Sequence, residues 1–149
     1  WNDSPFNLYP AKGAYMWRDL KRLCDDLGLP LQRPPVFPQN GLNAARIAFA
    51  GQDAAWGPEF VRRVYAANFA EGRDISDFAV LGGILTAIGQ DAAAIIARSR
   101  EDAVKLGFRK QNEDAVARGI FGAPSFTVGD ELFWGNDRLE GAVRWAKRS

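Results

Sequence analysis

The sequence of 149 residues contains no histidine and a single cysteine, Cys24. Without histidine, Ser-His and Cys-His catalysis and the usual zinc sites are excluded from these residues. A lone cysteine cannot form an internal disulfide, and without a Cys-x-x-Cys pair dithiol redox chemistry is excluded as well. Cys24 falls among the leucines of a predicted helix, where a free cysteine is more often a small buried side chain than a reactive thiol. Any chemistry is therefore expected to come from a bound cofactor.

The sequence also lacks long apolar runs and clustered charge. No run of about 18 apolar residues occurs, so no membrane-spanning helix is predicted. The 19 basic and 18 acidic residues give a net charge of +1, with no basic block of the kind that binds nucleic acid. Since 47% of the residues are hydrophobic, an ordinary level for a globular protein, we expect a soluble, cytoplasmic chain with a buried core.

Most of the chain is predicted to be helical. The apolar stripe from Met16 to Leu27 predicts a helix that Gly28 and Pro30 end. Three prolines between Gln32 and Pro38 require an extended segment. Further helices are predicted from apolar faces at about 42–49, 58–69 and 80–88, from Asp91 as the cap of a short helix to Ala97, and at about 100–118.

The stretch from Gly119 to Leu139 is the most informative part of the sequence. It contains Ala123-Pro124-Ser125 and then an alternating run that predicts a strand, which a proline can begin because it need not donate there. X-Pro bonds become cis at a modest cost, and a cis bond would turn the backbone groups of Ala123 outward, toward an extended peptide-like ligand. The alternative is a strand that simply starts with proline.

A hairpin and a helix start follow in the same stretch. Gly129-Asp130-Glu131 predicts the turn before a return strand at 132–134. Asp137 and Glu140 have the spacing of a capping box, and the N–H groups of a helix start can receive a carboxylate. Because Asn136 and Asp137 add an amide and an anion that attracts an ammonium group, this helix start could hold a γ-glutamyl group. The alternative is that both residues merely cap the helix.

The runs at 119–126 and 129–139 closely resemble the 2-hydroxychromene-2-carboxylate isomerase family, whose relatives are kappa-class glutathione transferases and DsbA-type oxidoreductases. The resemblance extends to 12–20, 34–40, 75–77 and 115–118. It implies a mostly α-helical chain of the α/β class, with a large helical domain inserted in a thioredoxin-like domain. Residues 1–105 would be the inserted helical domain, and 106–149 the C-terminal hairpin and helices of the thioredoxin-like domain.

Members of this family begin with a strand-helix-strand segment, and their catalytic serine ends the first strand. The resemblance implies that this sequence starts just after that segment. No catalytic residue is therefore expected here, and none of the serines is assigned to that role; these are Ser4, Ser76, Ser99, Ser125 and Ser149.

The resemblance also implies binding roles for two sets of residues. The glutathione-binding residues would be Ala123, Pro124, Trp134, Gly135, Asn136 and Asp137. Lys12 and Asn40 would contact the substrate, or alternatively the glutathione, although Lys12 could be an ordinary solvated residue and Asn40 could instead cap the following helix.

The implied activity is the glutathione-dependent interconversion of 2-hydroxychromene-2-carboxylate and trans-o-hydroxybenzylidenepyruvate, in the catabolism of naphthalene-type aromatic compounds. The cofactor would be glutathione, the substrate a small aromatic carboxylate, and the partner a second copy in a homodimer, with no metal. Two alternatives remain open: a kappa-class-like glutathione transferase or peroxidase, and a binding module that catalyses nothing.

Overall fold

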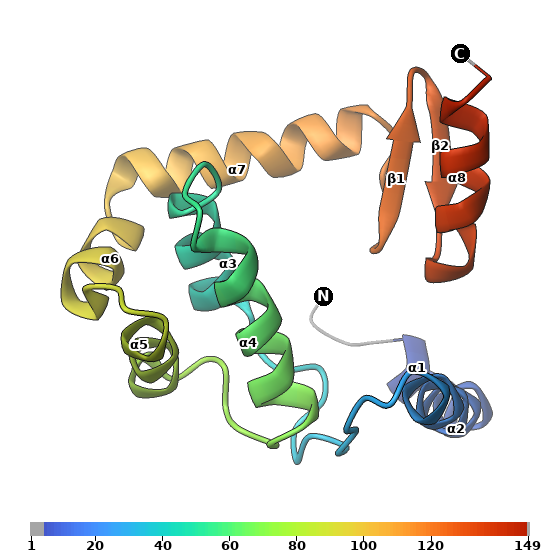
Figure 1. Ribbon diagram of the computed structural model, residues 1–149, viewed down its shortest axis with the longest axis horizontal. Helices are drawn as coiled ribbons and strands as arrows, with labels where there is room; N and C mark the ends of the chain where they lie inside the picture. The colour runs from blue at the N-terminus through green and yellow to red at the C-terminus, as the bar shows by residue number, and fades with distance from the viewer. Residues whose placement is uncertain (1–4, 149) are drawn as a thin grey trace. The chain divides into compact units, whose positions relative to one another are not determined.

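The structure, a computed structural model, describes residues 5–148 of the chain (Figure 1). It divides into two compact units, one extending to Lys105 and one beginning at Leu106. The elements in chain order are α1 Pro5–Leu8, α2 Pro10–Asp26, α3 Leu42–Ala50, α4 Gly57–Phe69, α5 Phe78–Ala87, α6 Ala92–Ser99, α7 Asp102–Ala117, β1 Ser125–Val128, β2 Glu131–Trp134, the 3-10 helix η1 Asn136–Arg138 and α8 Leu139–Ala146. The mostly helical composition predicted from the sequence is confirmed.

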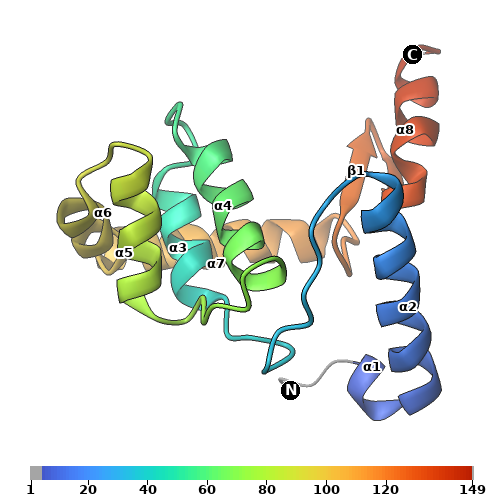
Figure 2. The same cartoon turned by 60° about the horizontal axis from the view of Figure 1, so that its bottom comes forward.

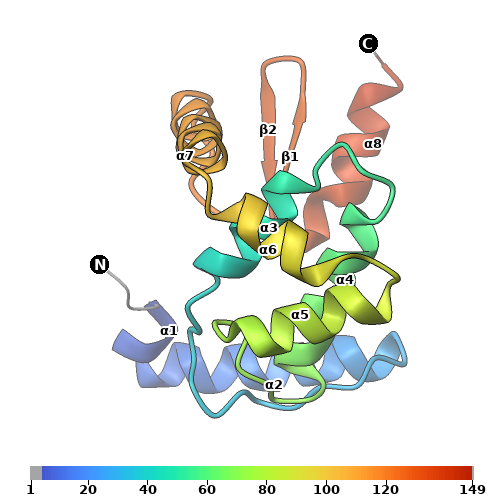
Figure 3. The same cartoon turned by 90° about the vertical axis from the view of Figure 1, so that its left-hand side faces the viewer.

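Four helices of the first unit, α3 to α6, surround an apolar core (Figures 2 and 3). The side chains of Ile47, Phe60, Leu81 and Leu85 are fully buried there. They come from α3, α4 and α5, and each lies on the apolar face of its helix. The contacts of α3 with α4 and α6, and of α5 with α4 and α6, join these faces around one centre.

Short polar side chains fix where these helices begin. The carboxylate of Asp91 accepts a hydrogen bond from Ala94 N at 3.0 Å, which confirms the predicted cap of α6. Asp77 caps α5 in the same way through Ala79 N at 2.8 Å. Pro58 lies in the first turn of α4, as the sequence predicts, because its missing N–H would have no partner there.

The proline-rich segment before α3 contacts α1 and α2. The rings of Trp17 and Phe37 meet edge to face with centroids 4.9 Å apart, and the Arg33 guanidinium lies 5.2 Å from the Trp17 ring. Asn7 Nδ2 donates to the Phe37 carbonyl at 2.9 Å. These contacts hold the extended segment on the first two helices.

Cys24 is expected to be a buried side chain of the helix, but the structure shows it only partly buried. Leu23 and Leu27, from the same apolar stripe, are exposed. The reason is that α2 packs mainly on the short α1, while the buried core of the unit lies among α3 to α6. The helix itself is confirmed, with Gly28 at φ +66° just after its end.

In the second unit, α8 lies against an antiparallel hairpin of β1 and β2 (Figure 1). Val128 pairs with Glu131, so Gly129 and Asp130 form a two-residue turn, with Gly129 at φ +58°. The return strand therefore begins one residue earlier than predicted. Ala142 of α8 is buried against this hairpin, which makes β1, β2 and α8 one small layered structure.

We expect Leu81→Ala to lower the free energy of unfolding by about 2–5 kcal/mol, because it removes a fully buried side chain and leaves a cavity. Thr86→Ala, at an exposed position of the same helix, should change it by no more than about 0.5 kcal/mol. Urea denaturation followed by circular dichroism measures both variants. Equal effects of the two substitutions would contradict the assignment of the core.

Candidate functional site

The predicted glutathione-binding residues come together at the open end of the hairpin. Gly135 N donates to the Pro124 carbonyl at 3.0 Å, and Ser125 pairs with Trp134 across the two strands. The Ala123–Pro124 peptide bond is cis. The sequence places Pro124 and Gly135 eleven positions apart, and the sheet register makes them neighbours.

Ala123 is an exposed residue at this end of the sheet. Its N–H and C=O have no hydrogen-bond partner within residues 5–148. The turn before it is fixed by Ser125 Oγ, which donates to the Gly122 carbonyl at 2.6 Å. A free donor and acceptor next to a strand end can pair with an extended ligand, as an added strand does.

An aromatic pair flanks this backbone. The rings of Phe121 and Trp134 lie 5.0 Å apart at an interplanar angle of 59°, and both side chains are more than half exposed. Gly122 permits the approach, since a Cβ at that position would lie 2.6 Å from Trp134 Nε1. The indole therefore covers Gly122 directly beside the free backbone of Ala123.

The chain turns sharply after β2, at Gly135. Its φ of +116° is a conformation that side-chain-bearing residues rarely adopt, and Asp137 Oδ1 lies 2.6 Å from the position that a Cβ would occupy. The carboxylate of Asp137 is thus folded back over the turn. Asn136 and Asp137 are both exposed, and their N–H groups have no acceptor in the described part of the chain.

The capping box predicted for Asp137 and Glu140 is wrong. Residues 136–138 form a 3-10 turn, α8 begins only at Leu139, and neither helix start has a side-chain cap. The spacing of three residues thus crosses a junction between two helix types instead of lying within one first turn. Asp137 Oδ2 is instead 3.4 Å from Arg138 Nη1.

Arg138 and Phe121 are residues of this site to which the sequence analysis gave no role. Arg138 places a guanidinium 3.4 Å from the Asp137 carboxylate, and Phe121 packs on Trp134. The sequence signal for either is weak, since a single arginine at a helix start and a phenylalanine after a glycine are common. Their positions depend on the hairpin register.

The two predicted substrate contacts, Lys12 and Asn40, belong to the first unit. Asn40 Oδ1 accepts a hydrogen bond from Leu42 N at 3.1 Å. The N-cap residue of α3 is Gly41, which has no side-chain cap, so Asn40 is not the cap itself but bonds the first residue of the helix from one position before the cap. The Lys12 side chain is exposed on α2, with Nζ 5.0 Å from the centroid of the Tyr9 ring. Each residue therefore has a structural contact of its own.

The loop that carries Asn40 is held by its neighbour Gln39. Gln39 Nε2 donates to the Arg73 carbonyl at 3.2 Å, and its Oε1 accepts from Ile75 N at 2.8 Å. Asp74, between these two residues, accepts hydrogen bonds from the hydroxyl and the N–H of Ser76, which lower the pKa of its carboxyl group.

No helix in the described part of the chain is long and apolar enough to cross a membrane.

Comparison with known proteins gives a consistent fold and family. A solved structure of a 2-hydroxychromene-2-carboxylate isomerase superposes with a TM-score of 0.81 at 24% identity, covering 98% of this chain and 71% of the other, so the two share a fold. A family profile described as a DSBA-like thioredoxin domain matches residues 2–144. The chain therefore belongs to the DSBA-like thioredoxin domain family, and the fold class inferred from the sequence is confirmed.

Two relatives are more similar in sequence. The 2-hydroxychromene-2-carboxylate isomerase of Sphingobium xenophagum is 37% identical over 125 residues, which are 84% of this chain and 63% of the relative. The enzyme of the same name from Pseudomonas putida is 33% identical over 135 residues, 82% of this chain and 64% of the relative. The chain thus spans a little under two thirds of the length of these relatives.

We expect Gly122→Ala to shift the NMR resonance of the Trp134 indole N–H, because the added methyl group would occupy space 2.6 Å from Nε1 and displace the ring. Gly141→Ala in α8 is the matched control, since a methyl group there meets only atoms at 4.0 Å. Trp134→Phe identifies the resonance. An unchanged Trp134 signal in Gly122→Ala would contradict the close packing described here.

Proposed function

We propose that this chain provides the glutathione-binding part of a glutathione-dependent isomerase acting on 2-hydroxychromene-2-carboxylate. The observation that carries the proposal is the similarity to relatives of that name, over more than four fifths of the chain. The proposed product is trans-o-hydroxybenzylidenepyruvate, and the proposed setting is the cytoplasmic breakdown of naphthalene-type aromatic compounds by a homodimer. The geometry of the hairpin end supports the choice of cofactor.

The cysteinyl part of glutathione fits the backbone of Ala123. Ala123 is an exposed residue, and its backbone has one unpaired donor and one unpaired acceptor within the described residues, the pattern that a peptide unit of the ligand needs. Pro124 and Trp134 border the same position through the bond to Gly135 and the pairing with Ser125. A ligand that pairs with the backbone of Ala123 would lie near the turn at Gly135, because Gly135 N bonds to the carbonyl of the next residue, Pro124.

The γ-glutamyl end fits the turn at Gly135. Its carboxylate would be met by the N–H groups of Asn136 and Asp137 and by the Arg138 guanidinium, and its ammonium group by the Asp137 carboxylate. Both side chains of the existing Asp137–Arg138 pair are exposed, so the pair is a weak interaction that a zwitterionic ligand could replace. One charge pair on the protein thus matches the charge pair on the ligand.

Bound glutathione would supply a thiolate that adds to a conjugated carbon of the ring-opened substrate and later leaves, so that the former double bond can rotate. The residues of this chain would bind and orient the cofactor. Lys12 would attract the substrate carboxylate with its flexible, exposed ammonium group. Asn40 would contact the substrate through Nδ2, because its Oδ1 is occupied by Leu42 N.

We expect Asp137→Asn and Arg138→Gln each to weaken glutathione binding about tenfold, equivalent to about 1.4 kcal/mol, because each removes one charged partner of the γ-glutamyl end. Isothermal titration calorimetry measures the affinity. Asp130→Asn, an exposed carboxylate in the hairpin turn of the same unit, should have no effect. The dipeptide Cys-Gly lacks the γ-glutamyl group, so its affinity should be equal for all variants.

Three results would separate the functions. Conversion of the chromene carboxylate with glutathione in catalytic amount supports the isomerase, and consumption of one glutathione per turnover with an electrophile would indicate a transferase instead. No heat of binding with glutathione would overturn the cofactor assignment and indicate a binding module. Equal loss of affinity in Asp130→Asn would show that the turn at Gly135 is not the γ-glutamyl site.

A further inference from the structure

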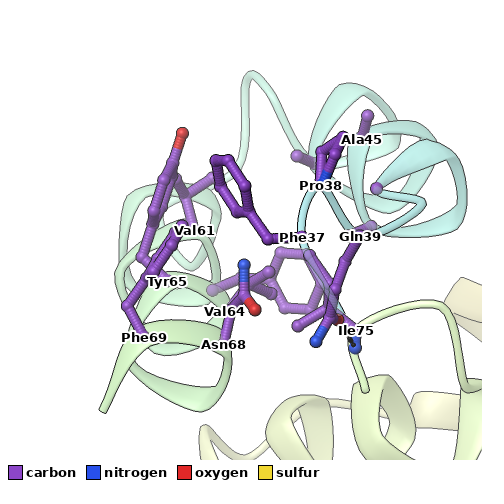
Figure 4. Close-up of a pocket in the computed structure, with 14 residues that line it drawn as sticks. Phe37, Pro38, Gln39, Ala45, Val61, Val64, Tyr65, Asn68, Phe69 and Ile75 are labelled. Atoms are coloured by element: carbon purple, nitrogen blue, oxygen red, sulfur yellow. Dashed lines mark hydrogen bonds between the residues drawn. The ribbon is translucent and has the colours of Figure 1, made fainter. Parts of the chain in front are cut away.

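A pocket of about 380 Å³ lies in the first unit, between α3, α4 and the loop that leads into α3 (Figure 4). This volume is within the range of about 300–1,000 Å³ that is common for small-molecule sites. One reason for the open space is the run of small residues on the facing side of α3, at Ala44, Ala45 and Ala48. The opposite wall carries Val61, Val64 and Tyr65 of α4.

Apolar and aromatic side chains form most of the lining. Phe37, Phe60, Tyr65 and Phe69 surround the space, and the rings of Tyr65 and Phe69 are stacked with centroids 6.2 Å apart. None of the lining residues carries a charge. A charged ligand would lose its hydration in this pocket without gaining a counter-charge, so the lining selects an uncharged molecule.

The side chain of Asn68 is the unusual feature of the pocket. It is only 6% exposed, and its Oδ1 is buried without a hydrogen-bond partner. Within residues 5–148 its Nδ2 has no acceptor either. Figure 4 shows the amide lying between Val64 and Ile75, in the midst of the pocket's side chains. Buried polar groups are nearly always paired, because an unpaired one costs about 1–3 kcal/mol.

A second amide, that of Gln39, lines the pocket from the loop that leads into α3, and it differs from Asn68 in its hydrogen bonding. Its nitrogen donates to the Arg73 carbonyl and its oxygen accepts from Ile75 N, so each atom of this amide has a partner in the fold and holds the loop in place. Asn68 has no such structural role among the described residues. Its bonding capacity therefore remains available inside an apolar pocket.

We propose that this pocket binds a small, uncharged aromatic molecule that carries one hydroxyl group, with the hydroxyl bonded to the amide of Asn68. A hydroxyl oxygen accepts hydrogen bonds, so it would pair with Asn68 Nδ2, the end of the amide that is not fully buried. The aromatic ring would lie among the phenylalanines and the alanines. This ligand differs from glutathione and from an aromatic carboxylate, both of which are charged, so the site is additional to the proposed isomerase function.

The test compares two ligands of equal shape, 4-ethylphenol and 4-ethyltoluene, in which a methyl group replaces the hydroxyl. Asn68→Leu keeps the size of the side chain and removes its hydrogen bonding. We expect this substitution to weaken 4-ethylphenol binding about tenfold and to leave 4-ethyltoluene binding equal or stronger. The affinities follow from titrations monitored by the NMR signals of the Val64 and Ile75 methyl groups.

A second variant and a stability measurement complete the test. Ala45→Phe fills the pocket from α3 and should abolish binding of both ligands, while thermal melts show whether each variant is folded. Failure of the wild-type chain to bind 4-ethylphenol, or an equal effect of Asn68→Leu on both ligands, would overturn the proposal. No glutathione is present, so neither result depends on the proposed function.

Discussion

The candidate site depends on one hydrogen bond, from Gly135 N to the Pro124 carbonyl. Pro124 has no N–H, so its carbonyl is the only backbone group through which it can join the sheet. This bond continues the pairing of Ser125 with Trp134 by one more step and brings both ends of the hairpin sequence together. The free backbone of Ala123 and the turn at Gly135 become one surface because of it.

The two units are stabilised in different ways. The first has a buried core to which α3, α4 and α5 contribute fully buried side chains. In the described part of the second, α8 lies against the paired strands and Ala142 is its buried apolar side chain, while Phe121 and Trp134 are more than half exposed. Exposed aromatic rings next to unpaired backbone groups are typical of a surface that binds other molecules.

The sequence was sufficient for elements whose cause is local. The cap of α6 by Asp91 and the turn at Gly129 depend on residues next to each other, so their patterns predicted them correctly. The capping box at Asp137 failed because the positive φ of Gly135 and the 3-10 turn redirect the chain, which spacing alone does not reveal. The pocket around Asn68 was missed for a similar reason, since an asparagine on a helix carries no sign of its burial.

The two proposed sites of this chain differ in electrostatics, since one carries a charge pair and the other has no charged lining residue, and this difference favours different ligands. At the turn after β2, the exposed Asp137 carboxylate and the exposed Arg138 guanidinium lie 3.4 Å apart. Because an exposed ion pair is weak, each of the two groups could bind the opposite charge of a zwitterion instead at little cost. Around Asn68 no lining residue is charged, and desolvation would oppose such a ligand. A zwitterion that suits the first proposed site would therefore be disfavoured at the second, and an uncharged aromatic alcohol would gain nothing from the charges of the first.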